Sequence, residues 1–427
     1  MTETRQTVAT RRNIPGVLRQ HAEEAAILCG IRLHLWRAPD AKLLQLNRLD
    51  QRIAAHLDGL AIAGEAGMRL CDAALERPEP GTTFVAAVRA LETRDVRRLD
   101  RLLALGETLA EARPGLATAF VWVAPEWLQG VIPALLESPS SFRRQLGLLA
   151  CALHGADPGQ ALADAIGDDD PGLRAYALRV AGECGRLDLL GVCLAAETDA
   201  DEASRFAGAC SAVLLGDRWR SVQSLGRIAQ TDAPGRAQAQ GWLLRLLQPA
   251  QAAELLRRLS DEAEDLRALL RLVGMAGDPR FVPWLVEQMA QPALARLAGE
   301  SFSLITGADL AALELECAAP DDANFGPVDD PADDNVAMDE DDGLPWPDPV
   351  RVRAWWSAHA PAFQPGLRYF MGGPPSAARC RQVLRDGWQR QRLIAAEHLC
   401  LLQPGTRLFP VGAPAWRQQR WLCGVDG

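Results

Sequence analysis

The sequence predicts an all-α protein whose middle part is a solenoid of stacked helical hairpins, and three observations support this fold class. Arginine recurs at spacings of 31, 31, 31, 31 and 29 residues, at Arg143, Arg174, Arg205, Arg236, Arg267 and Arg296. Each arginine begins an apolar run of helix length. A glycine follows most of the arginines after ten to twelve residues, at Gly155, Gly185, Gly216, Gly277 and Gly307. Glycine is the residue best suited to end a helix, and internal repetition at a fixed period indicates a repeat architecture.

The repeating unit is predicted to be helix, turn, helix. A second apolar run follows the glycine, as in RLDLLGVCLAAE and PRFVPWLVEQMA. Acidic residues precede several first helices, as in DDDPG before Arg174, where they can cap the helix, and Pro171 and Pro234 suit an early helical position. Two helices in about 31 residues cannot bury their apolar faces alone, so neighbouring units must stack into a solenoid, which we assign to residues 81–317.

The repeat resembles a short HEAT-type repeat. The run DDDPGLRAYALRVAGECG carries the order Asp, Pro, Arg, Ala and then a glycine turn that is typical of such units. We expect the repeated arginines to brace one repeat against the next, by pairing with a preceding Asp or Glu or by covering a helix end. The alternative is a row of arginines that binds a ligand.

Residues 1–80 are predicted to form an N-terminal helical hairpin that caps the solenoid. Residues 14–36 and 41–75 read as long amphipathic helices, with apolar residues three and four apart, such as Leu46, Leu49, Ile53 and Leu57. A terminal element of a solenoid must present one polar face to solvent, so its sequence is expected to differ from the repeats.

An acidic linker is predicted over residues 318–349. The net charge of the chain is −10, yet the fifteen acidic residues from Glu300 to Asp348 lie in a stretch without Lys or Arg, so the rest of the chain carries +5. Low hydrophobicity, like charges and several prolines predict that the linker has no fixed secondary structure until something basic binds it. Its spacing of carboxylates does not complete an EF-hand loop.

Residues 350–427 are predicted to form a small tryptophan-rich helical module. This part contains five tryptophans, Trp355 and Trp356 among them, and Trp346 lies just before it in the linker. Tryptophans at such density form a core or a binding surface. Both interpretations stay open here.

The sequence gives no indication of catalysis, a cofactor or a metal centre. It contains no G-x-S-x-G elbow, no phosphate-binding loop, no G-x-G-x-x-G after a strand, no H-E-x-x-H and no C-x-x-C. His21 beside Glu23 and Glu24, and His56 beside Asp58, are interpreted as capping or packing histidines. The one enzymatic alternative is a nucleophile and base formed by Cys380 and His398 in the C-terminal module.

Charge and targeting patterns predict a cytoplasmic protein. A negative net charge argues against a general polyanion binder, and the use of arginine for all basic residues except Lys42 is interpreted as genomic composition rather than as a nucleic-acid surface. No apolar segment follows the basic N-terminus, and no apolar run is long enough to span a membrane. Scattered cysteines favour a reducing compartment.

Both ends of the chain resemble an uncharacterised proteobacterial family of HEAT-repeat proteins, some of which are encoded near type VI secretion genes. The resemblance rests on the run QHAEEAAILCGIRLHLW and its continuation to Gly67, and on DGLPWPDPVRVRAWW and VLRDGWQRQRLIAAEHLCLLQPG. It implies a HEAT-like solenoid and supplies no catalytic residues. It also implies a cytoplasmic chaperone or adaptor for a secretion effector or spike component.

We therefore predict a non-catalytic scaffold or adaptor that binds a protein partner, since stacked repeats create an extended concave surface. The candidate partner-binding residues are Arg174, Arg205, Arg236, Arg267, Trp346, Trp355 and Trp356. The rival hypothesis is a nucleic-acid-binding protein with an arginine-lined groove, as in HEAT-like proteins that resemble alkylpurine glycosylases. In that case the acidic linker could occupy the groove as an internal mimic of phosphate.

Overall fold

The protein is all-helical in the computed structural model, which describes residues 14–232, 234–261, 265–320 and 339–424. These residues contain isolated β-bridges but no β-strand, which is compatible with an α-solenoid. None of the described helices has the length and apolar character needed to cross a bilayer. The acidic residues 321–338 of the predicted linker lie outside the described residues.

Contacts divide the chain into two compact units. The described residues of the first unit are 14–36, 44–156 and 412–419, and those of the second are 37–43, 157–411 and 420–424. Helices of the first unit are α1 (Pro15–Leu35), α2 (Leu43–Ile62), α3 (Glu65–Ala74), α4 (Pro80–Glu92), α5 (Val96–Thr108), α6 (Arg113–Trp122), α7 (Val131–Leu136) and α8 (Ser141–His154). The first residue of α2, Leu43, belongs to the second unit, and α22 (Ala415–Leu422) is likewise divided between the two.

The second unit begins with α9 (Gln160–Ile166) and ends its helical series with α21. The helices between these two are α10 (Pro171–Glu183), α11 (Leu190–Ala195), α12 (Glu202–Leu214), α13 (Arg220–Ile228), α14 (Arg236–Leu246), α15 (Pro249–Asp261), α16 (Leu266–Ala276), α17 (Val282–Gln288), α18 (Pro292–Thr306), α19 (Pro349–His359) and α20 (Ala377–Asp386), and α21 spans Gln389–Leu402.

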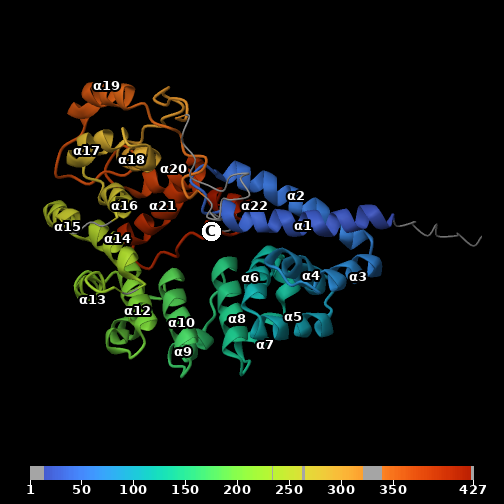
Figure 1. Ribbon diagram of the computed structural model, residues 1–427. Helices are drawn as coiled ribbons and strands as arrows, with labels where there is room; N and C mark the ends of the chain where they lie inside the picture. Colours follow the sequence, from blue (N-terminus) through green and yellow to red (C-terminus); the bar gives the residue numbers. More distant parts are fainter. Residues whose placement is uncertain (1–13, 233, 262–264, 321–338, 425–427) are drawn as a thin grey trace, which may run out of the picture. The chain divides into compact units, whose positions relative to one another are not determined.

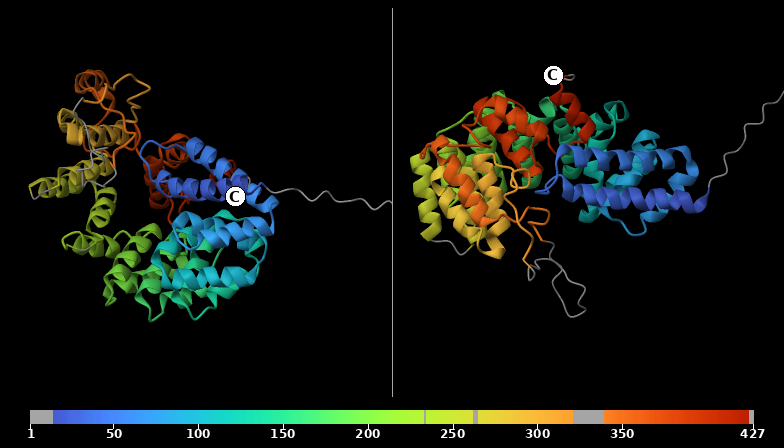
Figure 2. Two further views of the ribbon diagram at one scale, coloured as in Figure 1. Left: turned by 45° about the vertical axis from the view of Figure 1, so that its right-hand side comes forward. Right: turned by 90° about the horizontal axis from the view of Figure 1, so that it is seen from above.

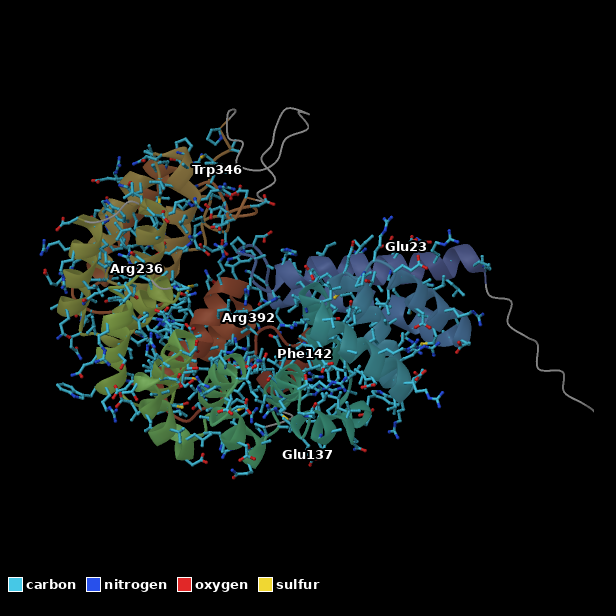
Figure 3. All side chains as sticks on the ribbon, turned by 60° about the horizontal axis from the view of Figure 1, so that its bottom comes forward. Glu23, Glu137, Phe142, Arg236, Trp346 and Arg392 are labelled. Atoms are coloured by element: carbon cyan, nitrogen blue, oxygen red, sulfur yellow. The ribbon has the colours of Figure 1, made fainter. Side chains whose placement is uncertain are left out.

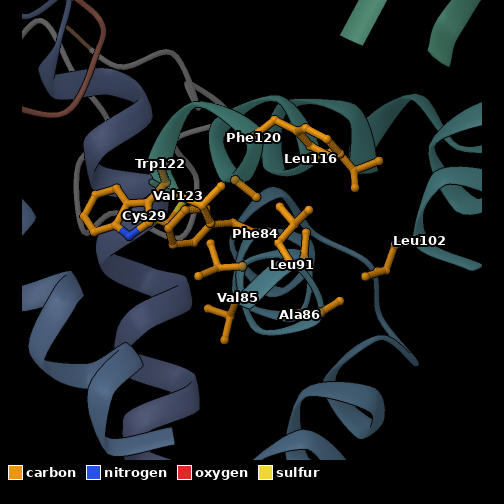
Figure 4. Close-up of a cluster of buried hydrophobic side chains, with 14 of the residues drawn as sticks. Cys29, Phe84, Val85, Ala86, Leu91, Leu102, Leu116, Phe120, Trp122 and Val123 are labelled. Carbon is orange, nitrogen blue, oxygen red and sulfur yellow. The ribbon is translucent and has the colours of Figure 1, made fainter. Parts of the chain in front are cut away.

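The first unit is built around α4, which packs against α1 and α6. Phe84 from α4 and Phe120 from α6 are fully buried, and Trp122 meets Phe84 edge to face with ring centroids 5.5 Å apart. Figure 4 shows these rings together with aliphatic side chains of α4 in one cluster. Burial of so much apolar area is the main stabilising term of this unit.

The chain returns to the first unit near its C-terminus, at residues 412–419. Trp416 packs edge to face on Trp122, with 4.6 Å between the centroids. The guanidinium of Arg417 donates to the carbonyls of Val121 and Val123, which end α6. These contacts satisfy carbonyls that a helix end leaves without internal donors.

The second unit contains a row of helical pairs in which α10 packs on α12, α14 on α16 and α16 on α18 (Figures 1 and 2). The intervening helices α9, α11, α13, α15 and α17 pack on the helices of this row. Hydroxyl groups link neighbours in the row, because Ser211 Oγ donates to the Leu178 carbonyl at 2.7 Å and Ser301 Oγ to the Leu270 carbonyl at 2.9 Å. Both serines are buried, so each bond also satisfies a buried hydroxyl group.

The C-terminal part of the second unit lies along the carboxyl ends of the helices in this row. The amides of Met371, Tyr369, Gly405 and Leu408 donate to the carbonyls of Leu304, Gly277, Leu214 and Glu183, which end α18, α16, α12 and α10. Residues 369–408 therefore contact four helix ends of the row, first those of α16 and α18 and then those of α12 and α10. The periodicity of the sequence did not predict this arrangement, because the residues that make it donate through their backbone.

Two of the repeated glycines allow this close approach. Gly277 has φ +69°, and a Cβ there would lie 2.2 Å from the Tyr369 carbonyl oxygen. Gly185 has φ +70°, and its Cβ would lie 2.2 Å from the Gly405 carbonyl oxygen. Any other residue would be strained by its backbone conformation and would clash with the crossing chain. The glycine spacing thus reports the helix ends, as predicted, and also the passage of the C-terminal segment.

Candidate functional site

Two of the predicted partner-binding arginines, Arg174 and Arg205, are engaged with turns between the repeats. Arg174 forms two hydrogen bonds with the Asp199 carboxylate, at 2.7 and 2.9 Å, and one with the Asp168 carbonyl at 2.8 Å. Arg205 donates to the carbonyls of Asp199 and Ala200. Because Asp199 lies in the turn after the repeat of Arg174, these contacts join two repeats, as the bracing interpretation expects.

Arg236 is different, because the partner that the described residues show for it is Asp232 in the preceding turn, at 3.2 Å, and the side chain is 42% exposed. Figure 3 shows Arg236 and Trp346 on separate parts of the second unit. An exposed pair of this kind contributes little to stability. The structure therefore does not bring the seven candidate residues together into one surface.

Arg267 belongs to a group of four arginines that holds a short acidic segment. Arg267 and Arg271 lie on one face of α16, Arg296 lies on α18, and Arg390 lies in the first turn of α21. We call these four residues the arginine cluster. Residues Asp339, Glu340 and Asp341, which we call the acidic turn, lie against them.

Each of the three acidic side chains pairs with an arginine of the cluster. The Nη1 atom of Arg267 is 2.8 Å from Asp341 Oδ2, Arg271 Nη2 is 2.6 Å from Glu340 Oε2, and Arg296 Nη2 is 2.6 Å from Asp339 Oδ2. The carboxylate of Asp341 raises the pKa of Arg267 by hydrogen bonding. Charge-assisted bonds of this length are among the stronger polar contacts in proteins.

Two arginines also bind the main chain of the acidic turn. Arg296 Nη1 donates to the Asp341 carbonyl at 3.0 Å, and Arg390 Nη2 donates to the Glu340 carbonyl at 2.7 Å. The second amino group of Arg390 pairs with Glu300 at 3.0 Å. Four guanidinium groups therefore face three carboxylates of the turn and one of α18, and the cluster without its turn would carry three uncompensated positive charges.

The acidic turn is shaped by its own hydrogen bonds. The amide of Asp341 donates to Asp339 Oδ1 at 3.0 Å, and the amides of Asp342 and Leu344 donate to the carbonyls of Asp339 and Asp341. Asp341 is 2% exposed, whereas Glu340 is 67% exposed. The cluster thus binds a hydrogen-bonded turn with one buried carboxylate and one at the rim.

The three candidate tryptophans lie in the same part of the second unit as the arginine cluster and α18. The guanidinium of Arg296 sits 4.8 Å from the centroid of the Trp346 ring, in a cation–π contact. Trp355 stacks on His359 at 4.1 Å and meets Phe302 edge to face, while Trp356 packs on Phe363. Trp355 and Trp356 are half-buried against the core of the unit.

Sequence reasoning selected Arg267 and Trp346 and missed Arg271, Arg296 and Arg390 as site residues. Arg296 belongs to the same arginine period, and the charge of residues 318–349 called for a basic counterpart, so these two signals together could have indicated the site. Arg390 carries no such signal, because it lies far along the chain and only the fold brings α21 to α18.

A cavity of about 400 Å³ lies beside the acidic turn, within the second unit. Its lining includes Glu300, Leu344, Arg379, Trp388 and Lys42. The ammonium group of Lys42, the one lysine of the chain, lies 4.2 Å from the Trp388 ring centroid. This contact and the hydrogen bond from the Gln389 amide to the Ala41 carbonyl hold residues 41 and 42 against α21.

The residues of the enzymatic alternative are unsuited to nucleophilic catalysis as they stand. Cys380 is fully buried, and burial raises its pKa to about 11, so the thiol is protonated near neutral pH. Burial and the nearby Arg245 and Arg368 lower the pKa of His398 to about 3, and its ring packs on Phe370. Neither side chain lines the cavity.

The two histidines near the N-terminus pair with each other in the first unit rather than with their acidic neighbours. His21 Nδ1 lies 3.1 Å from His56 Nδ1, so one ring must donate and the other accept. Burial and the His21 charge lower the pKa of His56. Among the described residues, no group of three or more His, Cys, Asp or Glu side chains could hold a metal ion.

Buried histidines predict that the stability of both units falls below about pH 6.5. The pKa of His154 is lowered to about 4 by burial and Arg417, and that of His398 to about 3. Because these folded values lie below the unfolded value, the unfolded chain binds the protons first as the pH falls. We expect each histidine to cost its unit about 2 kcal/mol between pH 7.5 and pH 5.

Urea unfolding at several pH values, followed by hydrogen exchange to resolve the units, measures this effect. H154Q should flatten the pH dependence of the first unit, and H398N that of the second. H34Q is the matched control, since His34 is exposed on α1. An unchanged slope in H398N would contradict the assignment.

Comparison with known proteins finds no family model that matches the chain, no similar curated protein and no similar solved structure.

Proposed function

We propose that this chain is a non-catalytic scaffold or adaptor that holds a protein partner through the arginine cluster. The observation that supports this function is the binding of a peptide segment, the acidic turn, by arginines from three helices that are far apart in sequence. Such a surface positions a peptide by charge and main-chain contacts without a group that performs chemistry.

The proposal includes a finer description of the fold. Residues 81–317 are HEAT-like repeats of about 31 residues, residues 1–80 cap them, and residues 350–427 form the C-terminal module. The row of helical pairs in the second unit and the contacts of Arg174 with the next repeat support this description. A stacked row provides the length of surface that a scaffold needs.

The proposed partner follows from the resemblance of both chain ends to a proteobacterial HEAT-repeat family. Members encoded near type VI secretion genes suggest an effector or spike component as the partner, bound in the cytoplasm before export. The rival, a nucleic-acid-binding groove, is less favoured because Arg174 and Arg205 donate to carbonyls and carboxylates of neighbouring repeats and are not free for phosphates.

Affinity purification from cells that express the chain naturally tests the function. We expect one specific protein to co-purify with the wild-type chain and to be lost with R271Q/R390Q, since this variant removes two guanidinium groups of the cluster. The matched control is R257Q, because Arg257 is an exposed arginine that pairs with Glu254 and Asp261 within α15 and lies outside the cluster. Recovery of the chain alone, or equal recovery with R271Q/R390Q, would remove the support for the proposal.

A further inference from the structure

The contacts of the acidic turn are those of a bound peptide ligand. Three consecutive acidic side chains and two main-chain carbonyls are all bound by arginines that belong to other elements. Within the turn, further hydrogen bonds link Asp339 with Asp341 and Asp342, and Asp341 with Leu344. The arginines therefore bind this segment as they would bind a peptide ligand, although it belongs to the same chain.

The chain is held on the C-terminal side of the turn by main-chain hydrogen bonds whose donors and acceptors lie outside the cluster. The Cys317 amide donates to the Trp346 carbonyl at 2.8 Å, and the Asp348 amide donates to the Leu315 carbonyl at 2.8 Å. This short antiparallel ladder, centred on Glu316 and Pro347, joins residues 315–317 to residues 346–348. The turn can consequently leave the arginines while the ladder keeps its attachment point in place.

The turn also occupies the cluster incompletely. Asp341 Oδ1 is buried and has no hydrogen-bond partner within the described part of the chain, which makes its burial costly. The pairs of Arg267 and Arg271 with Glu340 lie at the rim, where the arginine side chains are 32% and 35% exposed. Water screens such pairs, so exchange of this carboxylate is easy.

Resting on the proposed function, we infer that the arginine cluster is a receptor for an acidic turn of the partner protein, and that the chain's own acidic turn competes for the same place. A segment that occupies a site intramolecularly weakens the apparent affinity for an external ligand. The apparent dissociation constant equals the intrinsic one divided by the fraction of sites that are open. The partner thus needs a higher local concentration, or a better fit, than an open site would require.

The main-chain contacts favour a peptide over a nucleic acid. Arg296 and Arg390 donate to carbonyl oxygens of the turn, at positions set by the peptide backbone. Trp346 lies five residues beyond Asp341, and its ring covers the Arg296 guanidinium. The phosphate backbone of a nucleic acid offers negative charges. It does not offer peptide carbonyl acceptors and an aromatic ring at the spacing seen between Glu340, Asp341 and Trp346.

A peptide of the chain's own sequence at residues 339–346, DEDDGLPW, is the probe. It carries a fluorescent label and is titrated by anisotropy into the full-length wild-type chain and into D339N/E340Q/D341N. We expect the triple variant to bind the probe at least about tenfold more tightly than the wild type, because its own neutral turn no longer competes. The neutral peptide NQNNGLPW should bind neither protein.

Two further substitutions in the triple variant test whether the probe binds at the arginine cluster. Adding R271Q to the triple variant should weaken probe binding at least about tenfold, while adding R257Q should leave it unchanged. Arg271 is chosen because it is partly exposed, so its loss does not threaten folding, which thermal unfolding of each variant checks. A 20-base-pair duplex serves as the competing ligand at two salt concentrations.

The outcomes separate the possibilities. Equal affinity of the wild type and the triple variant overturns the competition, and absence of probe binding in both overturns the acidic-turn receptor. Tight, steeply salt-dependent binding of the duplex without probe binding overturns the peptide assignment. If a partner is captured through the arginine cluster but the probe does not bind, only this inference fails, whereas loss of the capture itself contradicts the proposed function.

Discussion

Replacing Arg32 by Met is expected to destabilise the first unit by about 3–5 kcal/mol, because it leaves a buried carboxylate without its counter-ion. Asp50 is fully buried, and its Oδ1 atom lies 2.6 Å from Arg32 Nε. The other oxygen accepts a hydrogen bond from the Ala415 amide at 2.7 Å. Burial raises the pKa of Asp50, and Arg32 opposes that rise.

The buried carboxylate also gives this variant a pH-dependent stability. Without Arg32 the folded pKa of Asp50 rises further above its unfolded value, so the folded variant binds a proton more tightly than the unfolded chain. The carboxyl then favours folding at low pH and loses that contribution as the pH rises through the folded pKa. The deficit of R32M should therefore be larger at pH 8 than at pH 5.

Two further variants make the test specific to the ion pair. R32M/D50N should recover at least half of the lost stability, because no unpaired charge remains buried. R52M is the surface control, since Arg52 is exposed on α2, and it should change the free energy of unfolding by less than about 0.5 kcal/mol. Urea unfolding with hydrogen exchange of α1 and α2 gives the values. A loss below about 1 kcal/mol in R32M would contradict the prediction.

Replacing Arg368 by Met is expected to destabilise the second unit by about 3 kcal/mol. The guanidinium donates to the carbonyls of Leu244, Arg245 and Leu247 at 2.5–2.7 Å and to that of Ala276 at 3.3 Å. These oxygens end α14 and α16, where helix carbonyls lack internal donors. Removing one partner leaves several acceptors unsatisfied at once, each at a cost of about 1 kcal/mol.

The conservative variant R368K tests whether the shape of the Arg368 guanidinium matters or only its positive charge. R368K keeps the charge but presents a single ammonium group that cannot reach carbonyls of two helices in the same way, so its stability should fall between those of the wild type and R368M. R381M on the exposed side of α20 is the control. Hydrogen exchange should increase at the carboxyl ends of α14 and α16 in R368M. Equal stability of R368M and R381M would show that the carbonyls find other donors.

The candidate site could be predicted only in part. The arginine period placed Arg267 and Arg296 on equivalent helices, and the charge count isolated the acidic segment, because both signals are local along the chain. Nothing local indicates that Asp341 would be buried beside Arg267, since that depends on the ladder of residues 315–317 with residues 346–348. Arg390 joins the site from α21, and the contact of Arg390 with Glu300 spans ninety residues.

The sequence by itself determined the helical class and several helix ends marked by glycine, because the spacing of apolar residues, capping groups and glycines acts within one or two turns of the backbone. It did not show that the helix predicted over residues 41–75 is divided into α2 and α3 at Ala63 and Gly64. The tertiary structure decided where the C-terminal segment goes. It contacts the carboxyl ends of α16, α18, α12 and α10 through backbone hydrogen bonds, which any residue except proline can donate, so the donating residues themselves show no pattern in the sequence. It also decided that the arginines near the acidic turn bind a segment of their own chain, because ion pairs depend on distance in space and not on separation in sequence.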